Sequence, residues 1–378
     1  MEITAAVLAG MNATPPYATS RPLTLKRLQL DPPGPGEVLV RIKAAGLCHS
    51  DLSVINGNRP RPMPMALGHE AAGIVEEVGP VEGARSDLVP GDHVVFVFVP
   101  SCGYCEPCTV GRPALCEPGA AANGAGTLLS GARRLHRSDG TAVNHHLGVS
   151  AFADFATVSR HSLVKVHQDL PLNEAALFGC AVLTGVGAVF NTAQVPAGSS
   201  VAVIGLGGVG LSSLLGAVAA GARRIVAIAR SEPKLAFARE LGATDTFNAR
   251  DPDAIAEIKA ATQGGVEYAF EMAGSPSALD MAFQITRRGG TTVTGGLPPP
   301  TATLPLHPVT LVAEERTLKG SYIGTAVPGR DIPRYIELYR HGRLPVDKLL
   351  SGTLKHHELN EGFDRLHEGT VVRQVVLL

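Results

Sequence analysis

A glycine-rich turn between an apolar run and a helical run is the feature that most constrains the fold. In the stretch VAVIGLGGVGLSSLL, Gly205, Gly207 and Gly210 form the pattern G-x-G-x-x-G directly after a predicted strand and before a predicted helix. The first glycine permits a tight turn, the second lets a pyrophosphate approach the backbone, and the third lets the helix pack closely on the strand. The pattern alone is weak evidence, but its strand-turn-helix setting favours a dinucleotide-binding unit over an ordinary glycine-rich turn.

The pattern of predicted strands and helices changes near residue 180, which indicates two domains. The 378 residues are 45% hydrophobic and 18% charged, enough for two cores. Short β-type runs such as EVLVRIKAAG, separated by Gly and Pro, fill the first half, whereas strand and helix patterns alternate after residue 182. Alternation is typical of a doubly wound parallel sheet. We therefore predict an α/β protein with a mostly β domain, residues 1–181 and 324–378, and a Rossmann domain, residues 182–323.

The stretch from 116 to 150 is rich in Gly, Ala and Asn. It is too long for an ordinary connection between two elements. We predict a surface excursion over the active-site side of the molecule.

The overall charge argues for a small-molecule partner. The formal net charge of −1 offers no basic surface for nucleic acid and no polybasic face for an anionic membrane. The first twenty residues lack a basic segment followed by a long apolar run, and no run of eighteen apolar residues occurs. We expect a cytoplasmic protein with no nucleic-acid or membrane partner.

Four of the six cysteines lie close together in the sequence. Cys102, Cys105, Cys108 and Cys116 form C-x2-C-x2-C-x7-C. In a reducing compartment such clusters bind metal more often than they form disulfides, and four thiolates can close a tetrahedron around a structural zinc ion. A redox pair or an iron–sulfur cluster is the alternative, but a redox pair starts a helix, and the glycines and proline here favour a loop.

The other two cysteines indicate a second metal site. Cys48 and Cys180 lie far apart in the sequence, and between them the segment GHEAAG carries His69 and Glu70. Three protein ligands leave a fourth position for water or substrate, which is typical of catalytic zinc. Each residue alone is more often a buried cysteine or a hydrogen-bonded histidine. Together with the cysteine-rich segment, the set favours a catalytic zinc ion.

As a set, these motifs resemble the zinc-containing medium-chain alcohol dehydrogenases, including the liver-type, class III-like and bacterial aryl-alcohol relatives. The similarity covers essentially the full length, through GLCHSDL, ALGHEAAGIVEEVG, VPGDHVVFVFVPSCGYCEPC, FGCAVLTGVGAV, GLGGVGLS, LNEGFDRL and VVRQVVLL. The resemblance implies a GroES-like domain with one catalytic and one structural zinc ion, a Rossmann coenzyme domain, and homodimers or homotetramers. It also implies reversible oxidation of an alcohol to an aldehyde or ketone.

The resemblance assigns roles around the catalytic zinc. Cys48, His69 and Cys180 would be ligands, and Glu70 would lie beside the ion as a neighbour or transient ligand. Asp51 would orient His69 through its ring N–H. The bound alcohol would ionise to an alkoxide, lose a hydride to the nicotinamide, and pass its proton to Ser50. Many relatives end this relay with a histidine where this chain has Ser53, so the final proton acceptor stays open.

The resemblance also assigns cofactor positions. They are His49 and Arg373 at the pyrophosphate, Thr184 and Val209 at the nicotinamide, Lys234 at the adenosine ribose, and the turn Gly205, Leu206, Gly207, Gly208 and Gly210.

The end of the second Rossmann strand bears on the choice of cofactor. An NAD site usually carries Asp or Glu about twenty residues past the glycine motif. Ala229 stands there, followed by Arg230, and Glu232 falls beyond the expected end of the strand. A guanidinium suits the 2′-phosphate, so we predict NADP, with NAD as the alternative if Arg230 is only a solvated surface residue.

The expected pocket residues are mixed in character. Matched to the resemblance, they are Phe98, Leu147 and Leu297 as an apolar wall, and Arg59, His146 and Tyr322 at further positions. We predict a primary alcohol or aldehyde substrate with an aromatic or medium-length apolar group. Arg59 faces either an acidic substrate group or solvent.

Three other functions are weighed against this prediction. Relatives that oxidise the glutathione adduct of formaldehyde with NAD carry an acid at Arg59 and an arginine at Ala120, so that activity ranks lower. A non-catalytic cofactor-binding relative would commonly have lost zinc ligands, which are all present here. A zinc-ribbon nucleic-acid module would need paired C-x-x-C knuckles and a basic surface.

Overall fold

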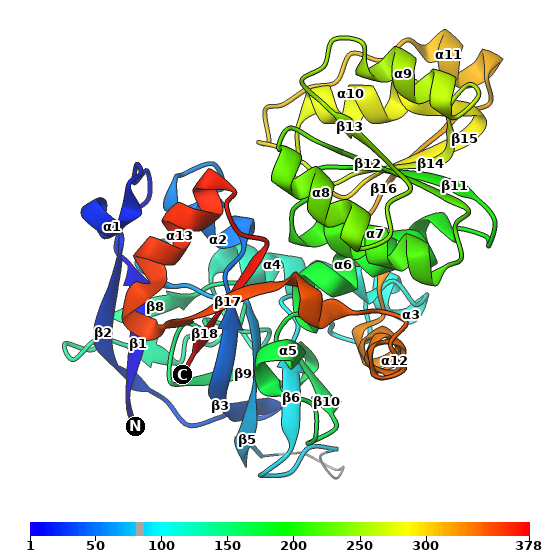
Figure 1. Ribbon diagram of the computed structural model, residues 1–378. Helices are drawn as coiled ribbons and strands as arrows, with labels where there is room; N and C mark the ends of the chain where they lie inside the picture. The colour runs from blue at the N-terminus through cyan, green and yellow to red at the C-terminus, as the bar shows by residue number, and fades with distance from the viewer. Residues whose placement is uncertain (81–86) are drawn as a thin grey trace. The chain divides into compact units, whose positions relative to one another are not determined.

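A computed structural model describes residues 1–80 and 87–378 of the chain. By contacts the chain divides into two compact units (Figure 1). The first contains Met1–Cys180, Val327–Arg334 and Asp347–Leu378, and the second contains Ala181–Ala326 and Tyr335–Val346. The boundaries predicted from sequence differ most at residues 335–346, which group with the second unit.

The first unit is built from two β layers. A closed barrel has the strand order β1 (Glu2–Leu8), β2 (Leu23–Leu30), β7 (Leu135–His136), β8 (Ala142–His145) and β4 (Met65–Ala66). The second sheet has the order β10 (Leu163–Val166), β6 (His93–Phe96), β5 (Glu70–Val78), β3 (Glu37–Gly46), β18 (Arg373–Leu377) and β17 (Leu350–Lys355), with β9 (Phe155–Ser159) also paired to β3. Aliphatic residues such as Ile3, Leu28 and Val143 fill the barrel, as expected for strands that bury one face.

The stretch from 116 to 150 is not the surface excursion that the sequence predicted. It contains helix α4 (Glu117–Ala125), β7 and β8, and the two strands help to close the barrel. Cys116 caps α4, since its Sγ accepts a hydrogen bond from the Gly119 N–H, and Gly126 ends the helix with φ of 69°. The prediction was wrong because strands this short show no period-two pattern, and the glycines in the helix mimic a loop.

The second unit is a six-stranded parallel sheet. Its order is β13 (Asp245–Asn248), β12 (Arg224–Ala229), β11 (Ser200–Ile204), β14 (Val266–Glu271), β15 (Thr286–Thr294) and β16 (Thr317–Gly320). Figure 1 shows α7 (Gly208–Ala219) and α8 (Glu232–Glu240) on one face, and α9 (Ala254–Ala261) and α10 (Pro276–Ile285) on the other. Both faces are therefore covered, which explains the continuous apolar runs of β11 and β12. The predicted α/β class with a doubly wound sheet is confirmed.

One helical stretch, Leu172–Ala193, is long and apolar enough to cross a membrane by length and composition, with a mean hydropathy of 1.6. However, 83% of its apolar window is buried inside the structure, as in the core helix of a folded domain.

The turn between β11 and α7 shows why each glycine is needed. Gly205 has φ of 91°, in the left-handed region that favours glycine. A Cβ on Gly210 would collide with the Gly205 carbonyl oxygen, whereas a Cβ on Gly207 would meet nothing within 4 Å. Gly210 therefore serves packing within the protein, and Gly207 leaves open space in front of the turn.

This difference predicts unequal effects of the two substitutions on stability. Gly210→Ala should lower the free energy of unfolding by about 1–3 kcal/mol, because α7 must move away from β11 to accommodate the methyl group. The matched variant Gly207→Ala should lower it by at most about 1 kcal/mol, since the methyl group points into open space and only the N-cap preference for glycine over alanine is lost. Thermal and urea unfolding measure both, and equal stability of the two variants would contradict this assignment.

Candidate active site

Neighbouring strands of the first unit deliver the residues of the three-ligand cluster. Cys48 follows the end of β3 and precedes α2 (His49–Ile55), and His69 lies immediately before β5. Because β3 and β5 pair with Gly46 opposite Glu70, the two ligand segments meet at the same end of these two strands. Cys180 joins them from a π-helical turn, Phe178–Val182. The ligand atoms of Cys48, His69, Glu70 and Cys180 all lie within 4.8 Å of one another, and all four residues are buried.

A glycine lets Cys180 reach this position. A Cβ on Gly179 would collide with the Phe96 carbonyl oxygen of β6. The absence of a side chain therefore allows the π-helical turn to pack directly against the sheet. Single π-helical turns occur frequently at functional sites, since they re-aim one side chain out of an otherwise regular helix.

The distances and charges of this cluster fit a zinc ion. Sγ of Cys180 lies 3.7 Å from Nε2 of His69, close to the roughly 3.5 Å expected between S and N ligands of tetrahedral zinc. A hydrogen bond from Cys180 holds the pKa of Cys48 well below its usual range, despite burial. Burial opposes the charged form of His69, but the charges of Asp51 and Cys48 outweigh it and raise its pKa to about 10. The cluster thus stabilises positive charge, which is what a set of zinc ligands requires.

Asp51, on the first turn of α2, holds the other side of His69. Its Oδ2 lies 3.1 Å from Nδ1 of His69, and its Oδ1 accepts a hydrogen bond from the Gly68 N–H at 3.1 Å. Burial raises the pKa of this carboxyl, but His69 and His146 outweigh it and lower the pKa to about 2. The carboxylate therefore stays ionised and keeps Nε2 of His69 directed at the two thiols.

Glu70 is paired with Arg373, which the sequence resemblance had assigned to the cofactor pyrophosphate. Arg373 begins β18, next to β3, and its guanidinium contacts Oε2 of Glu70. Oε1 of Glu70 lies 3.8 Å from Nε2 of His69. Gly46 leaves room for the pair, since a Cβ there would clash with Glu70. Contact of the buried Arg373 with a cofactor stays a prediction.

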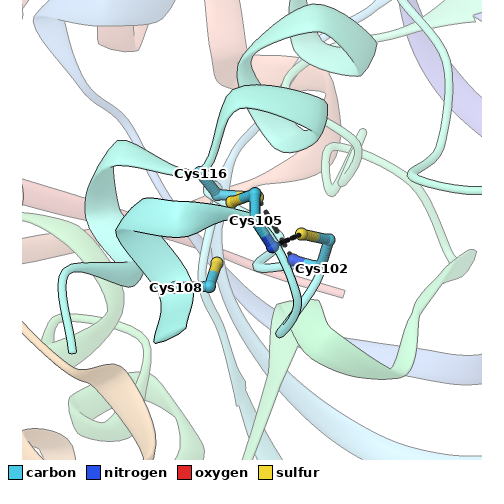
Figure 2. Close-up of side chains that lie close together, drawn as sticks. All are labelled: Cys102, Cys105, Cys108 and Cys116. Atoms are coloured by element: carbon cyan, nitrogen blue, oxygen red, sulfur yellow. Dashed lines mark hydrogen bonds between the residues drawn. The ribbon is translucent and has the colours of Figure 1, made fainter. Parts of the chain in front are cut away.

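The four-cysteine cluster forms a separate site (Figure 2). All four Sγ atoms lie within 4.8 Å of one another, and those of Cys105 and Cys116 are 3.9 Å apart. Thiolates about 2.3 Å from a tetrahedral zinc ion are about 3.8 Å apart. Backbone N–H groups of Cys102 and Gly119 donate to Sγ of Cys116, and that of Cys105 donates to Sγ of Cys102. These donors favour thiolates, although burial raises the pKa of Cys108 and Cys116. The spacing of the four sulfurs fits a closed metal site. Cys105 is the N-cap of helix α3 (Glu106–Thr109) and Cys108 lies on it, so the loop predicted from the glycines and proline is wrong for this part.

The proposed proton relay begins on α2. Ser50 is half-buried and His49 is exposed. The Ser53 hydroxyl, at the position where many relatives carry a histidine, donates a 2.8 Å hydrogen bond to the His49 carbonyl. Ser53 is therefore engaged with the backbone of its own helix.

The cofactor positions of the second unit surround the glycine turn and the end of β12. Gly207 is the N-cap of α7, so the first N–H groups of the helix face the open space in front of the turn. Leu206, Gly210 and Thr184, which lies on α6 (Leu183–Gly187), are buried, and Gly205, Gly207, Gly208 and Val209 are half-buried.

Positive charge gathers at the N-terminus of α8. Arg230 follows β12 and is exposed, and Lys234 is half-buried. Burial and the neighbouring Arg230 charge lower the pKa of Lys234, so the two basic groups lie close enough to interact. Glu232 accepts a 2.6 Å hydrogen bond from Asn248. Its carboxylate is therefore engaged with β13.

The expected pocket residues fall into three groups. Phe98 and His146 are buried and stack edge-on against the His69 ring, with centroid distances of 5.2 and 5.4 Å. Leu147 is buried with φ of 53°, and Arg59 is half-buried. Leu297 and Tyr322 belong to the second unit and are exposed. Whether these residues line one pocket stays a prediction.

Two contacts were not foreseen from the sequence. His146 reaches Asp51, and Arg373 pairs with Glu70. No local spacing connects these residues, since 95 and 303 positions separate the members of each pair (146 − 51 and 373 − 70). Only the packing of strands from distant parts of the chain brings them together.

Known proteins share both the fold and the sequence. Residues 34–168 match the family described as alcohol dehydrogenase GroES-like domain, and residues 208–340 match zinc-binding dehydrogenase. A Paracoccus denitrificans protein named S-(hydroxymethyl)glutathione dehydrogenase is 36% identical over 366 residues, 94% of this chain and 96% of that protein.

Two solved structures superpose along the whole chain. An alcohol dehydrogenase zinc-binding domain protein from Burkholderia ambifaria has a TM-score of 0.93 and 34% identity, covering 100% of this chain and 99% of that one. Benzyl alcohol dehydrogenase from Acinetobacter calcoaceticus has a TM-score of 0.91 and 33% identity, with the same coverage.

Fold and site together define a zinc-binding, nicotinamide-dependent class of oxidoreductase. The chain belongs to the zinc-containing medium-chain alcohol dehydrogenase family.

Proposed function

We propose that this protein transfers a hydride reversibly between NADP(H) and a primary alcohol or aldehyde with an aromatic or medium-length apolar group. The convergence of Cys48, His69 and Cys180 on one point carries the proposal, since three ligands leave a coordination position for substrate. The four-cysteine site would hold a second, structural zinc ion. The buried side chains of Phe98 and Leu147 favour an apolar substrate. The similarity to a benzyl alcohol dehydrogenase supports an aromatic one.

The residues around the cluster have distinct tasks in this reaction. Zinc bound there would supply a Lewis acid for the substrate oxygen. Oδ2 of Asp51 lies 3.1 Å from Nδ1 of His69, which would orient the ring and leave Nε2 as a ligand. Arg373 neutralises Glu70 and holds its Oε2. The Ser50 hydroxyl would accept the substrate proton while it releases its own proton toward solvent. Ser53 donates its hydrogen to the His49 carbonyl and is no base at neutral pH, so the relay would end at water.

The proposed preference for NADP rests on the end of β12. Ala229 offers no carboxylate to repel a phosphate, and Glu232 is bonded to Asn248. Arg230 and Lys234 supply two positive charges at the start of α8, whose N-terminal N–H groups also favour an anion.

Removing one of these charges should separate the two cofactors. Arg230→Ala should lower kcat/KM for NADP about 10- to 100-fold, the loss of one charge-assisted hydrogen bond, and change kcat/KM for NAD less than about 3-fold. The control Arg239→Ala removes the same charge from the last turn of α8 and should leave both values near wild type. A wild-type preference for NAD would refute the proposed cofactor.

Steady-state assays on a panel of alcohols and aldehydes test the reaction itself. We expect the highest kcat/KM for aromatic or medium-length primary alcohols with NADP. Cys180→Ala removes one ligand of the three-ligand cluster and should lower kcat at least about 1,000-fold, since the Lewis acid supplies several kcal/mol. The variant should still fold, and the metal content of the four-cysteine site should be retained. Turnover by Cys180→Ala near the wild-type rate would remove the basis of the proposal.

A glutathione-dependent formaldehyde dehydrogenase that uses NAD is the second candidate, favoured by the 36% identical Paracoccus relative. Arg59 and Ala120, which replace the acid and arginine of such relatives, argue against it. Formaldehyde oxidation that requires added glutathione would establish this candidate instead. A protein that binds a nicotinamide cofactor yet turns over neither set of substrates would be a non-catalytic relative.

We also propose that two copies pair through the exposed edge of the parallel sheet. Within the described chain, β16 pairs with β15 on one side only, and Val309, Val312 and Leu318 nearby are exposed. An unprotected edge with apolar neighbours favours pairing with a second strand. Light scattering should give about twice the chain mass of 39.2 kDa, or four times for a tetramer, and Val312→Glu should shift it downward. A monomer mass would contradict the pairing.

A cytoplasmic location remains part of the proposal.

A further inference from the structure

Asp51 contacts two histidines. Its Oδ2 lies 3.1 Å from Nδ1 of His69, and its Oδ1 lies 3.0 Å from Nδ1 of His146. The Gly68 N–H also donates to Oδ1, at 3.1 Å. Asp51 and His69 are 0% exposed and His146 is 1% exposed, so these contacts are shielded from water. The carboxylate is thus shared between a proposed zinc ligand and a second histidine, which lies outside the set Cys48, His69 and Cys180.

The loop that carries His146 is constrained at several points. Leu147 and Ser150 have φ of 53° and 57°, in the left-handed region that non-glycine residues rarely adopt. The His146 N–H donates to Oγ of Ser150 at 3.0 Å, and Oγ of Ser150 donates to the Ala66 carbonyl at 2.8 Å. Such backbone strain persists only where the surroundings over-determine the conformation. The loop therefore fixes His146 against the segment that leads into His69.

The chemistry of the contacts sets the direction of each hydrogen. An ionised carboxylate is an acceptor only, so the nitrogens that face Asp51 must carry hydrogen. In His69 this leaves Nε2 free to bind metal. In His146 it places the hydrogen on Nδ1, which lies 3.0 Å from Oδ1. With the Gly68 N–H, His146 therefore holds one oxygen of Asp51 while His69 contacts the other.

We propose that His146 is a positioning residue of the three-ligand zinc site, which holds the Asp51 carboxylate in the rotation that orients His69. The inference rests on the proposed catalytic zinc. Without His146, Oδ1 would keep only the Gly68 N–H, and the buried carboxylate could rotate away from the ring of His69. Loss of such an outer contact typically weakens metal retention about 10- to 100-fold.

Three substitutions separate the polar contact made by Nδ1 of His146 from the volume of the ring. His146→Leu removes the donor and keeps an apolar side chain of similar size. His146→Asn keeps a donor, since the Asn Nδ2 lies near the position of the histidine Nδ1. His146→Gln places its donor one bond further out, near the position of Nε2.

The test measures zinc release from the purified, zinc-loaded protein to a coloured chelator. The wild type should release two zinc ions per chain in two phases, and Cys180→Ala identifies which phase belongs to the three-ligand site. His146→Leu should release that ion at least about 10-fold faster, while the four-cysteine phase is unchanged. His146→Asn should stay within about 3-fold of wild type, as expected if the donor alone matters. The kcat of His146→Leu should fall more than its KM for the alcohol rises.

The outcomes distinguish the possibilities. Wild-type protein with only one zinc ion per chain would contradict the proposed catalytic site itself. Two zinc ions with unchanged release from His146→Leu would overturn only the role of His146. Equally fast release from His146→Asn and His146→Leu would also overturn it, because the ring would then act by volume. If His146→Leu does not fold, His146→Asn must retain zinc better than His146→Gln, and equal rates for these two would refute the role.

Discussion

The pairing of β3 with β5 is the constraint on which the three-ligand site depends. Its register places Gly46 opposite Glu70, so the chain that leaves β3 delivers Cys48 where the chain that enters β5 delivers His69. On the other side of β3, β18 brings Arg373 to Glu70. A shift of one residue would turn every side chain of the strand to the opposite face. The same backbone hydrogen bonds that build the sheet therefore set the spacing of the ligand segments.

Burial of the polar side chains near the three-ligand site is unfavourable for the free energy of folding. Asp51, His69, Glu70, His146 and Arg373 are all at least 95% buried. Removing charges from water is unfavourable unless each finds a partner. Here the partners form two connected groups, since His69 and His146 share Asp51, and Arg373 pairs with Glu70. A cation between the two thiols and His69 would complete the balance of charge, so metal binding and the stability of this region are coupled.

Local patterns in the sequence predicted much of the fold and of the candidate sites. The turn Gly205 to Gly210 and the run Cys102 to Cys116 could be interpreted from spacing alone, because the parts of each lie within one short segment of the chain. The contacts of His146 and Arg373 could not, because they depend on which strands become neighbours. The barrel strands within 116–150 were missed for a related reason. Strands of two to four residues are specified by pairing with distant partners rather than by their own composition.

The two metal sites differ in a way that follows from their construction. One short segment, Cys102–Gly119, supplies the four thiolates, and its own N–H groups bond to the sulfurs of Cys102 and Cys116. Four ligands from one segment leave no coordination position open. The other site takes its ligands from the ends of two paired strands and from a π-helical turn, so it depends on the register of the sheet. That dependence is what allows three ligands to stay in place without a fourth, since the strands rather than the metal hold them apart.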